Sequence, residues 1–86
     1  MIHKVKLAKI GLTMETGTIT HWLKRVGDFV AQGEPLFEVE TDKATQTIES
    51  FHAGYLKRIL VPEGTEIPVN TVIAYVGDKD DQAPLG

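Results

Sequence analysis

Short runs of alternating apolar and polar residues recur along the whole of this 86-residue chain. Glycine or proline interrupts every run, and such punctuation at intervals of about 8–12 residues is typical of an all-β sandwich or barrel. A helix over residues 19–26 is disfavoured by Gly17, Thr18, Thr20 and Gly27. The apolar residues of the predicted strands are Val5, Leu7, Ile19, Trp22, Leu23, Phe37, Val39, Ile48, Leu56, Ile59, Ile73 and Tyr75.

The sequence also resembles itself when it is shifted by 37 positions, which aligns residues 17–39 with residues 54–76 without a gap. The pattern predicts two similar halves of about four strands each, which pack their apolar faces together with quasi-twofold symmetry. We expect the matched glycines to serve turns that need positive φ. The matched pairs are Gly17 with Gly54, Ile19 with Leu56, Trp22 with Ile59, Leu23 with Leu60, Gly27 with Gly64, Val30 with Ile67, Leu36 with Ile73 and Val39 with Val76.

The composition of the chain argues against several classes of function. The chain is long enough for one domain, contains no run of about 20 apolar residues, and begins without a recognisable signal peptide, so we expect a soluble cytoplasmic domain away from membranes. The net charge of −3 and the dispersed basic residues argue against nucleic-acid binding. The absence of cysteine excludes disulfides, thiolate nucleophiles and cysteine-ligated zinc, so a cofactor must supply the sulfur for any redox chemistry.

The chain shows no pattern expected of a self-contained enzyme or a metal site. Ser50 lacks the glycine-flanked elbow of a hydrolase nucleophile, and His3, His21 and His52 lack metal-ligand spacing. Trp22 and Phe29 are interpreted as core or half-buried packing residues.

The segment "EVETDKATQTIE", residues 38–49, places one lysine between two strand-like runs. A two-residue connection of Asp42 and Lys43 would form a tight hairpin, because aspartate bonds nearby backbone N–H groups and lysine tolerates an exposed tip. This hairpin would point Lys43 into solvent. A plain charged turn is the simpler interpretation of the same residues.

The motif Glu40-Thr41-Asp42-Lys43-Ala44, with "GLTMETGTITHWLKRVGD" before it and "GYLKRILVPEGTEIPVNTVIAYV" after it, resembles the lipoyl domains of 2-oxo acid dehydrogenase complexes over nearly the whole chain. The resemblance implies the lipoyl/biotinyl carrier fold, a flattened barrel or sandwich of two four-stranded antiparallel sheets. It also implies that lipoic acid is bound covalently to Lys43 as N6-lipoyl-lysine.

In that family the lipoyl group is attached by a lipoate ligase or lipoyl transferase. It is then reductively acylated by a decarboxylase (E1), delivers the acyl group to the acyltransferase core (E2) for transfer to coenzyme A, and is reoxidised by dihydrolipoyl dehydrogenase (E3). The resemblance therefore implies a carrier, monomeric as an isolated domain, whose parent chain is an acyltransferase of pyruvate or acetoin dehydrogenase type. A parent E3 chain with an N-terminal lipoyl domain is the lesser alternative.

The resemblance further implies that the loop of residues 11–16, "GLTMET", lies near the lysine tip and takes part in recognition. Leu12 and Met14 are equally suited to the core. The acids Glu38, Glu40 and Asp42 could be read electrostatically by partners or could only keep the tip soluble. The candidate recognition residues are Leu12, Thr13, Met14, Glu15, Glu40, Thr41, Asp42 and Ala44.

Domain limits and rival functions complete the expectations. Residues 1–77 are predicted to form the lipoyl domain, and the polar residues 78–86 to begin a flexible linker or a frayed end. A biotin carrier domain is the closest rival, but methionines flank the lysine in that family, where this chain has Asp42 and Ala44. The glycine-cleavage carrier protein is longer, and an unmodified lipoyl-like interaction module would lack the attached group.

Overall fold

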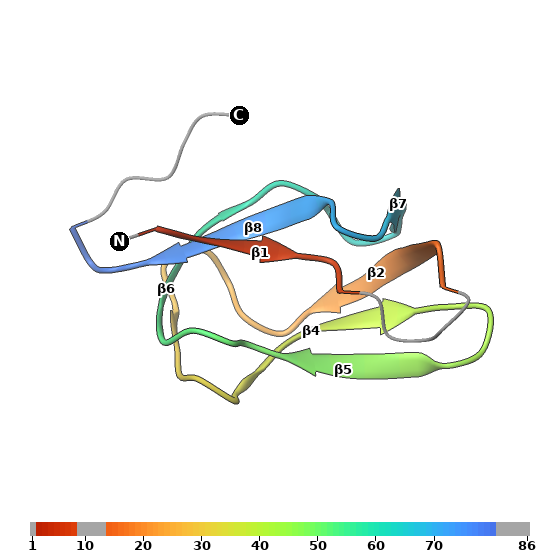
Figure 1. Ribbon diagram of the computed structural model, residues 1–86. Coiled ribbons are helices and arrows are strands. Elements are labelled where there is room, and N and C mark those ends of the chain that lie inside the picture. Colours follow the sequence, from red (N-terminus) through yellow and green to blue (C-terminus); the bar gives the residue numbers. More distant parts are fainter. Residues whose placement is uncertain (1, 9–13, 81–86) are drawn as a thin grey trace.

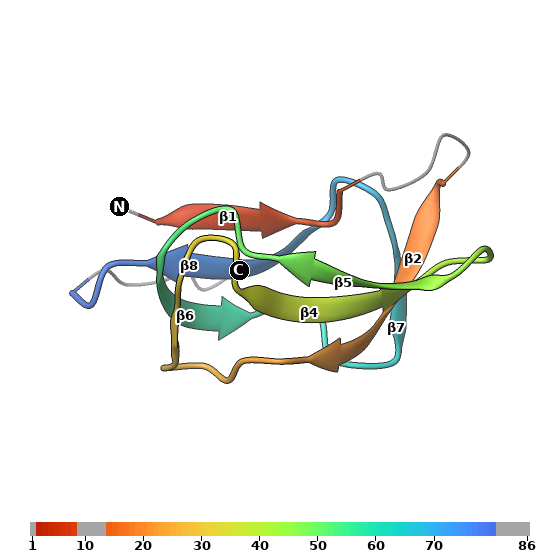
Figure 2. The ribbon, with the colours of Figure 1, turned by 90° about the horizontal axis from the view of Figure 1, so that it is seen from below.

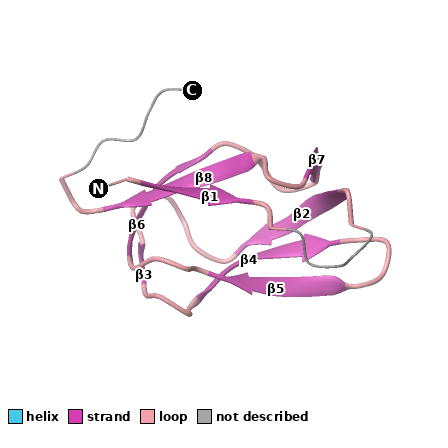
Figure 3. Cartoon of the chain, in the orientation of Figure 1, coloured by secondary structure: helices cyan, strands magenta, loops and turns pink. Residues whose placement is uncertain are grey.

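The computed structural model describes residues 2–8 and 14–80, and these residues form strands and no helix (Figure 3). The all-β prediction is confirmed. The strands are β1 (His3–Lys6), β2 (Thr16–Trp22), β3 (Phe29–Val30), β4 (Pro35–Glu40), β5 (Thr45–Glu49), β6 (Gly54–Ile59), β7 (Thr65–Pro68) and β8 (Val72–Gly77).

The strands form two four-stranded antiparallel sheets, with the orders β1-β8-β6-β3 and β5-β4-β2-β7. Figures 1 and 2 show the two layers from perpendicular directions. Within the described residues no strand of one sheet pairs with a strand of the other, so the sheets form a sandwich and are not closed into a barrel. The predicted pair of sheets is confirmed, and the edge strands β1, β3, β5 and β7 each have one side that pairs with no other described strand.

The predicted quasi-twofold symmetry extends to the hydrogen bonds. The strands of the two sheets correspond in order: β1 to β5, β8 to β4, β6 to β2, and β3 to β7. The pair Ile19↔Val39 recurs as Leu56↔Val76, and a bulge follows both Ile19 and Leu56. The turn after each of the strands β2 and β6 is hydrogen-bonded to the other of these two strands. Gly27 N donates to Leu56 O (2.7 Å), and Gly64 N donates to Ile19 O (2.6 Å).

The edge strands β1 and β5 are also equivalent, although the shift of 37 positions does not align them. Asn70 N donates to Leu7 O (2.7 Å), and Gly33 N donates to Ser50 O (2.8 Å), so Leu7 corresponds to Ser50. Ten positions separate Leu7 from Gly17, whereas only four separate the two corresponding residues, Ser50 and Gly54. The unequal connections hide this part of the repeat from an ungapped comparison.

Two pairs of matched glycines have different roles. Gly27 and Gly64 have φ values of 98° and 86°, as predicted for turn residues. Gly17 and Gly54 instead lie within β2 and β6, so the prediction that they form turns is wrong, although Gly54 does have a positive φ, of 158°. Added Cβ atoms there would come within 2.8 Å of Val39 Cγ2 and of the carbonyl oxygen at the end of β8, respectively, so these two glycines permit close packing.

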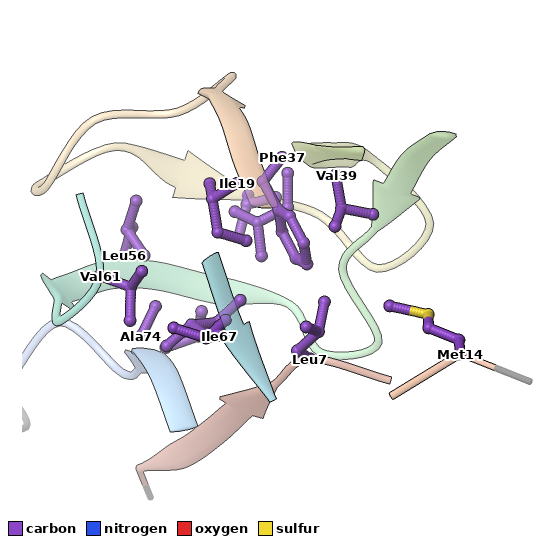
Figure 4. Packing of buried hydrophobic residues seen from close by; sticks show 13 residues of the cluster. Leu7, Met14, Ile19, Phe37, Val39, Leu56, Val61, Ile67 and Ala74 are labelled. Atoms are coloured by element: carbon purple, nitrogen blue, oxygen red, sulfur yellow. The ribbon is translucent and has the colours of Figure 1, made fainter. Parts of the chain in front are cut away.

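The core lies between the two sheets, and its residues come from both halves (Figure 4). Met14 lies at the edge of this cluster (Figure 4). Trp22 packs against the cluster, with its ring 5.3 Å from that of Phe37, and its Nε1 donates to Val61 O at 2.9 Å. Phe29 is 52% exposed and meets the ring of Tyr55 edge-on, which places it at the surface.

Candidate functional site

Lys43 lies at the tip of the hairpin that joins β4 to β5. Glu40 and Thr45 are paired across the two strands, and Thr41 N donates to Ala44 O at 2.9 Å, which continues the ladder toward the tip. Asp42 and Lys43 remain beyond that bond, as the two-residue connection predicted. Figures 1 and 2 show this tip extending past the end of the sandwich.

The Thr41 side chain holds the tip together. Its hydroxyl donates to Ala44 O (3.1 Å) and accepts bonds from Lys43 N (3.2 Å) and Ala44 N (3.3 Å). Among the described non-glycine residues only Asn70 has a positive φ, so the tip differs from the common hairpin turns that need left-handed residues. The threonine hydroxyl thus satisfies two N–H groups that the turn leaves without main-chain partners.

The Lys43 side chain is exposed, and the described part of the chain offers no hydrogen-bond or ion-pair partner to its Nζ. The neighbouring residues Thr45, Gln46 and Thr47 are all exposed, although successive residues of a strand point to opposite faces. The first three residues of β5 are therefore exposed on both faces of the strand. An amine in this position is accessible to a modifying enzyme, and a group attached there would extend into solvent.

A polar hollow of about 440 Å³ lies beside the tip and brings together predicted recognition residues from two separate segments. Its lining residues are Met14, Glu15, Thr16, Gly17, Thr18, Glu40, Thr41, Asp42 and Glu66. Ala44 does not line it, and the predicted residues Leu12 and Thr13 lie outside the described residues.

Met14 and Glu15 anchor the segment before β2 on opposite sides. Met14 is 7% exposed and packs in the core, and it also lines the hollow. Glu15 is exposed, while its main-chain carbonyl accepts a bond from Val69 N at 2.9 Å. Packing and a main-chain bond thus fix this wall of the hollow relative to the hairpin.

The acids near the tip are not equivalent. Glu38 is partly buried and lies 3.0 Å from His21 Nδ1, its partner across β2 and β4. Glu40 and Asp42 are exposed and line the hollow. The contact of His21 was not predicted, and it leaves Glu40 and Asp42 as the more accessible acids beside Lys43.

Charge is segregated between the two sheets. In the described strands, β5-β4-β2-β7 carry four acids and no lysine or arginine, whereas β1-β8-β6-β3 carry four basic residues and no acid. The lysine hairpin belongs to the acidic sheet. The acids are Glu38, Glu40, Glu49 and Glu66, and the basic residues are Lys4, Lys6, Lys57 and Arg58.

The residues considered for other chemistry have structural contacts. Ser50 is buried and its hydroxyl donates to His52 O at 2.6 Å. The rings of His3 and His52 stack with centroids 3.8 Å apart. The residues that the structure describes include no helix long and apolar enough to span a membrane.

The sandwich with an exposed lysine on a hairpin defines a class of carrier domain. The family model described as "Biotin-requiring enzyme", of the biotin/lipoyl type, matches residues 3–76. The chain belongs to this family, which confirms the predicted kind of domain.

Three relatives are named as dihydrolipoyllysine-residue acetyltransferase components. The chain is 38% identical over 84 residues to the dihydrolipoyllysine-residue acetyltransferase component of the pyruvate dehydrogenase complex of Rickettsia prowazekii, covering 95% of this chain and 21% of that protein. It is 52% identical over 71 residues to the mitochondrial component of the same name from Saccharomyces cerevisiae, covering 80% of this chain and 15% of the relative. It is 38% identical over 81 residues to the corresponding component of the acetoin cleaving system of Bacillus subtilis, covering 94% and 20%. The chain thus spans between 15% and 21% of the length of these relatives.

Proposed function

We propose that Lys43 is the attachment site of lipoic acid and that this domain is a lipoyl carrier. The main support for this proposal is the exposed lysine at the tip of a projecting hairpin, in a chain whose relatives are named for a dihydrolipoyllysine residue. The site needs no enclosed cofactor pocket, because the bond to Nζ is covalent. The accessible Nζ and the fixed tip fit such an attachment.

The chain's own residues position the attachment point. Thr41 and the β4–β5 ladder hold the tip at a defined place on a packed sheet. Amide formation at Nζ removes the lysine charge, so Glu40 and Asp42 then dominate the local field. A lipoyl group held there would supply a disulfide able to take up an acyl group and two electrons.

We propose that the parent chain is an acyltransferase, which agrees with the names of its relatives. Its partners would be a 2-oxo acid decarboxylase, the acyltransferase core, dihydrolipoyl dehydrogenase and a lipoate ligase or lipoyl transferase. Residues 1–77 would form the carrier and residues 78–86 would begin a tether that keeps the lysine at high effective concentration near these partners. A cytoplasmic location stays a prediction, because one of the relatives is mitochondrial.

We propose that partners recognise the domain through the hollow beside the tip. Glu15, Glu40 and Asp42 present carboxylates from two segments of the chain around one concave surface. Thr41 and Met14 contribute mainly by holding those segments in place. A partner that binds this acidic surface would need a complementary positive charge at its own binding site.

Intact-mass measurement tests the attachment. The domain is produced with lipoate ligase and lipoic acid, and separately with biotin ligase and biotin. We expect the lipoyl mass on the native chain and on Lys79→Arg, and no gain on Lys43→Arg. Lys79 is a matched control because it is exposed and follows Asp78, as Lys43 follows Asp42.

Three outcomes would contradict the proposal: no gain on the native chain, a persistent gain on Lys43→Arg, or a gain only with biotin. The last would make the domain a biotin carrier. Reductive acylation of the lipoylated domain by the E1 components of a pyruvate dehydrogenase complex and of an acetoin dehydrogenase complex then tests the proposed partners. Acylation by neither enzyme would contradict the proposed type of complex.

A further inference from the structure

A second surface lies away from the lysine tip, along the seam between the edge strands β1 and β5. A cavity of about 270 Å³ opens there, lined mainly by apolar residues of both sheets that include Val5, Phe37, Ile48 and Val76. A closed apolar cavity of about 150 Å³ already holds benzene, so this one has room for an apolar side chain. Phe51 lines it and is 70% exposed.

The β1 side of this seam is basic. Lys4 and Lys6 are exposed and line the cavity, while Val5 between them packs against the core. β1 pairs with β8 on one side and, among the described strands, with none on the other. The opposite side of the seam carries Glu49.

Lysines on an edge strand commonly prevent unwanted strand pairing. Lys4 and Lys6 would repel a second copy of β1 or a basic segment, but they would attract an acidic one. The same two residues that discourage self-association therefore select a partner of opposite charge.

We propose that the free edge of β1 binds an extended acidic segment of a partner protein by strand addition. In an added strand, successive side chains point to opposite faces of the sheet. Acidic side chains at alternate positions would lie beside Lys4 and Lys6, and the apolar side chain between them would enter the cavity next to Val5. The recognised sequence therefore alternates acidic and apolar residues.

Charge distinguishes β1 from its symmetry mate. On β5 the residues equivalent to Lys4 and Lys6 are Thr47 and Glu49, which offer no cation to an acidic strand. Two lysines within a chain of net charge −3 are too few for strong attraction to nucleic acid or an anionic membrane. Main-chain pairing and one apolar anchor favour a protein segment.

The test is a titration of the isotopically labelled domain, followed by amide chemical shifts. The probe is a short blocked peptide of alternating aspartate and leucine, and the control peptides replace leucine by alanine or aspartate by lysine. We expect saturable shifts in β1 and in residues 48–52 at millimolar peptide, with little change at the hairpin tip. Because this site is separate from Lys43, unmodified protein and Lys43→Arg should give the same shifts. The result therefore does not depend on whether Lys43 is lipoylated.

Two pairs of variants separate charge from apolar contact. Lys4→Glu with Lys6→Glu should weaken binding at least tenfold, whereas Arg25→Glu with Lys79→Glu, which changes net charge equally, should leave it nearly unchanged. Phe51→Ala should weaken binding several-fold, and Phe29→Ala, which removes an exposed ring elsewhere, should not. If one variant fails to fold, the other pair and the control peptides still decide.

Several results would overturn the proposal. Absence of saturable shifts would leave Lys4 and Lys6 as edge protection alone. Equal binding of the alanine peptide would show that the cavity is not used. Equal shifts with anionic phospholipid vesicles or with a single-stranded oligonucleotide would show unspecific attraction of anions.

Discussion

The two ends of the sandwich are built from equivalent strands and differ in two connections, the longer one after β1 and the one that joins β4 to β5. At one end the residues Thr41–Ala44 join β4 to β5 and carry Lys43. At the other end β8 stops at Gly77 and β1 starts at His3, although these strands pair in the same register, with His3↔Val76 corresponding to Gln46↔Val39. The scaffold is repeated and the lysine tip is not, so the candidate chemistry lies where the symmetry is broken.

The charges of the two sheets differ as clearly as their connections do. The described strands of the lysine-bearing sheet carry acids and those of the other sheet carry basic residues, and the edge strands β5 and β1 show this contrast at corresponding positions, where Glu49 is the counterpart of Lys6. The cores of both halves obey the same packing requirements, whereas the outer faces are free to differ. Equivalent positions that have similar residues in both halves thus reflect the needs of folding. Equivalent positions that differ in charge are the better guide to binding partners.

The two close-packed glycines allow the largest test of the symmetry. Gly54→Ala should lower the free energy of unfolding by about 3 kcal/mol, because its Cβ would lie 2.8 Å from the backbone oxygen of Gly77. Gly17→Ala should cost about 1 kcal/mol, because its Cβ would meet the side chains of Val39 and Met14, which can move. Urea unfolding of both variants measures the difference. Equal losses, or a larger loss at Gly17, would show that the halves pack more alike than the contacts indicate.

The hairpin tip allows a smaller and more local test. Thr41→Val should make the Ala44 amide exchange with solvent about fivefold faster, because it removes an acceptor worth about 1 kcal/mol. Lipoylation of Lys43 should slow as the tip loosens, and global stability should change little. Thr41→Ser is the control, since it keeps the hydroxyl. Unchanged exchange in Thr41→Val would mean that the main chain alone shapes the tip.

The smallest predicted difference is in pH dependence. Ala31 N donates to Glu34 Oε1 at 3.0 Å and Lys24 lies 3.3 Å away, and these contacts, the backbone bond first, hold the pKa of Glu34 below its ordinary value of 4.5. The equivalent positions hold Pro68, which has no N–H, and Thr71, which does not titrate.

A lowered pKa stabilises the folded state above pH 4.5, and the stabilisation is lost as the pH falls through the folded-state value. The stability advantage of the native chain over Glu34→Gln should therefore be constant near neutral pH and shrink below pH 4.5. Thermal unfolding at a series of pH values measures it. Thr71→Val should differ from the native chain by a constant amount, and a gap between native and Glu34→Gln that persists at low pH would disprove the role of the carboxylate.

Sequence patterns predicted the sheets and the tip because both depend on local alternation and turn chemistry. The shift of 37 positions aligned β2 with β6 and β4 with β8, since the connections within those stretches are equal in length. It missed β1 and β5 because the connection after β1 is longer. Turn preferences located Lys43, but the bonds of Thr41 depend on side-chain geometry that no periodicity records.

Other features of the site arise only from pairing between distant strands. The contact of His21 with Glu38 depends on the register of β2 against β4 and on the bulge that follows Ile19. The misjudged role of Gly17 has the same origin, because what it touches is set by tertiary packing.

The pairing of β8 with β1 brings the end of the last strand next to the start of the first, at the place that corresponds to the hairpin between β4 and β5. A short loop from Gly77 to His3 would join them, and a new opening in the exposed turn of residues 25–28 would make a circular permutant with the same strand pairs. In such a permutant the chain ends, and with them the proposed tether, would move while the lysine tip stayed in place. The direction from which the domain is held and the direction in which Lys43 points are therefore separable properties of this architecture.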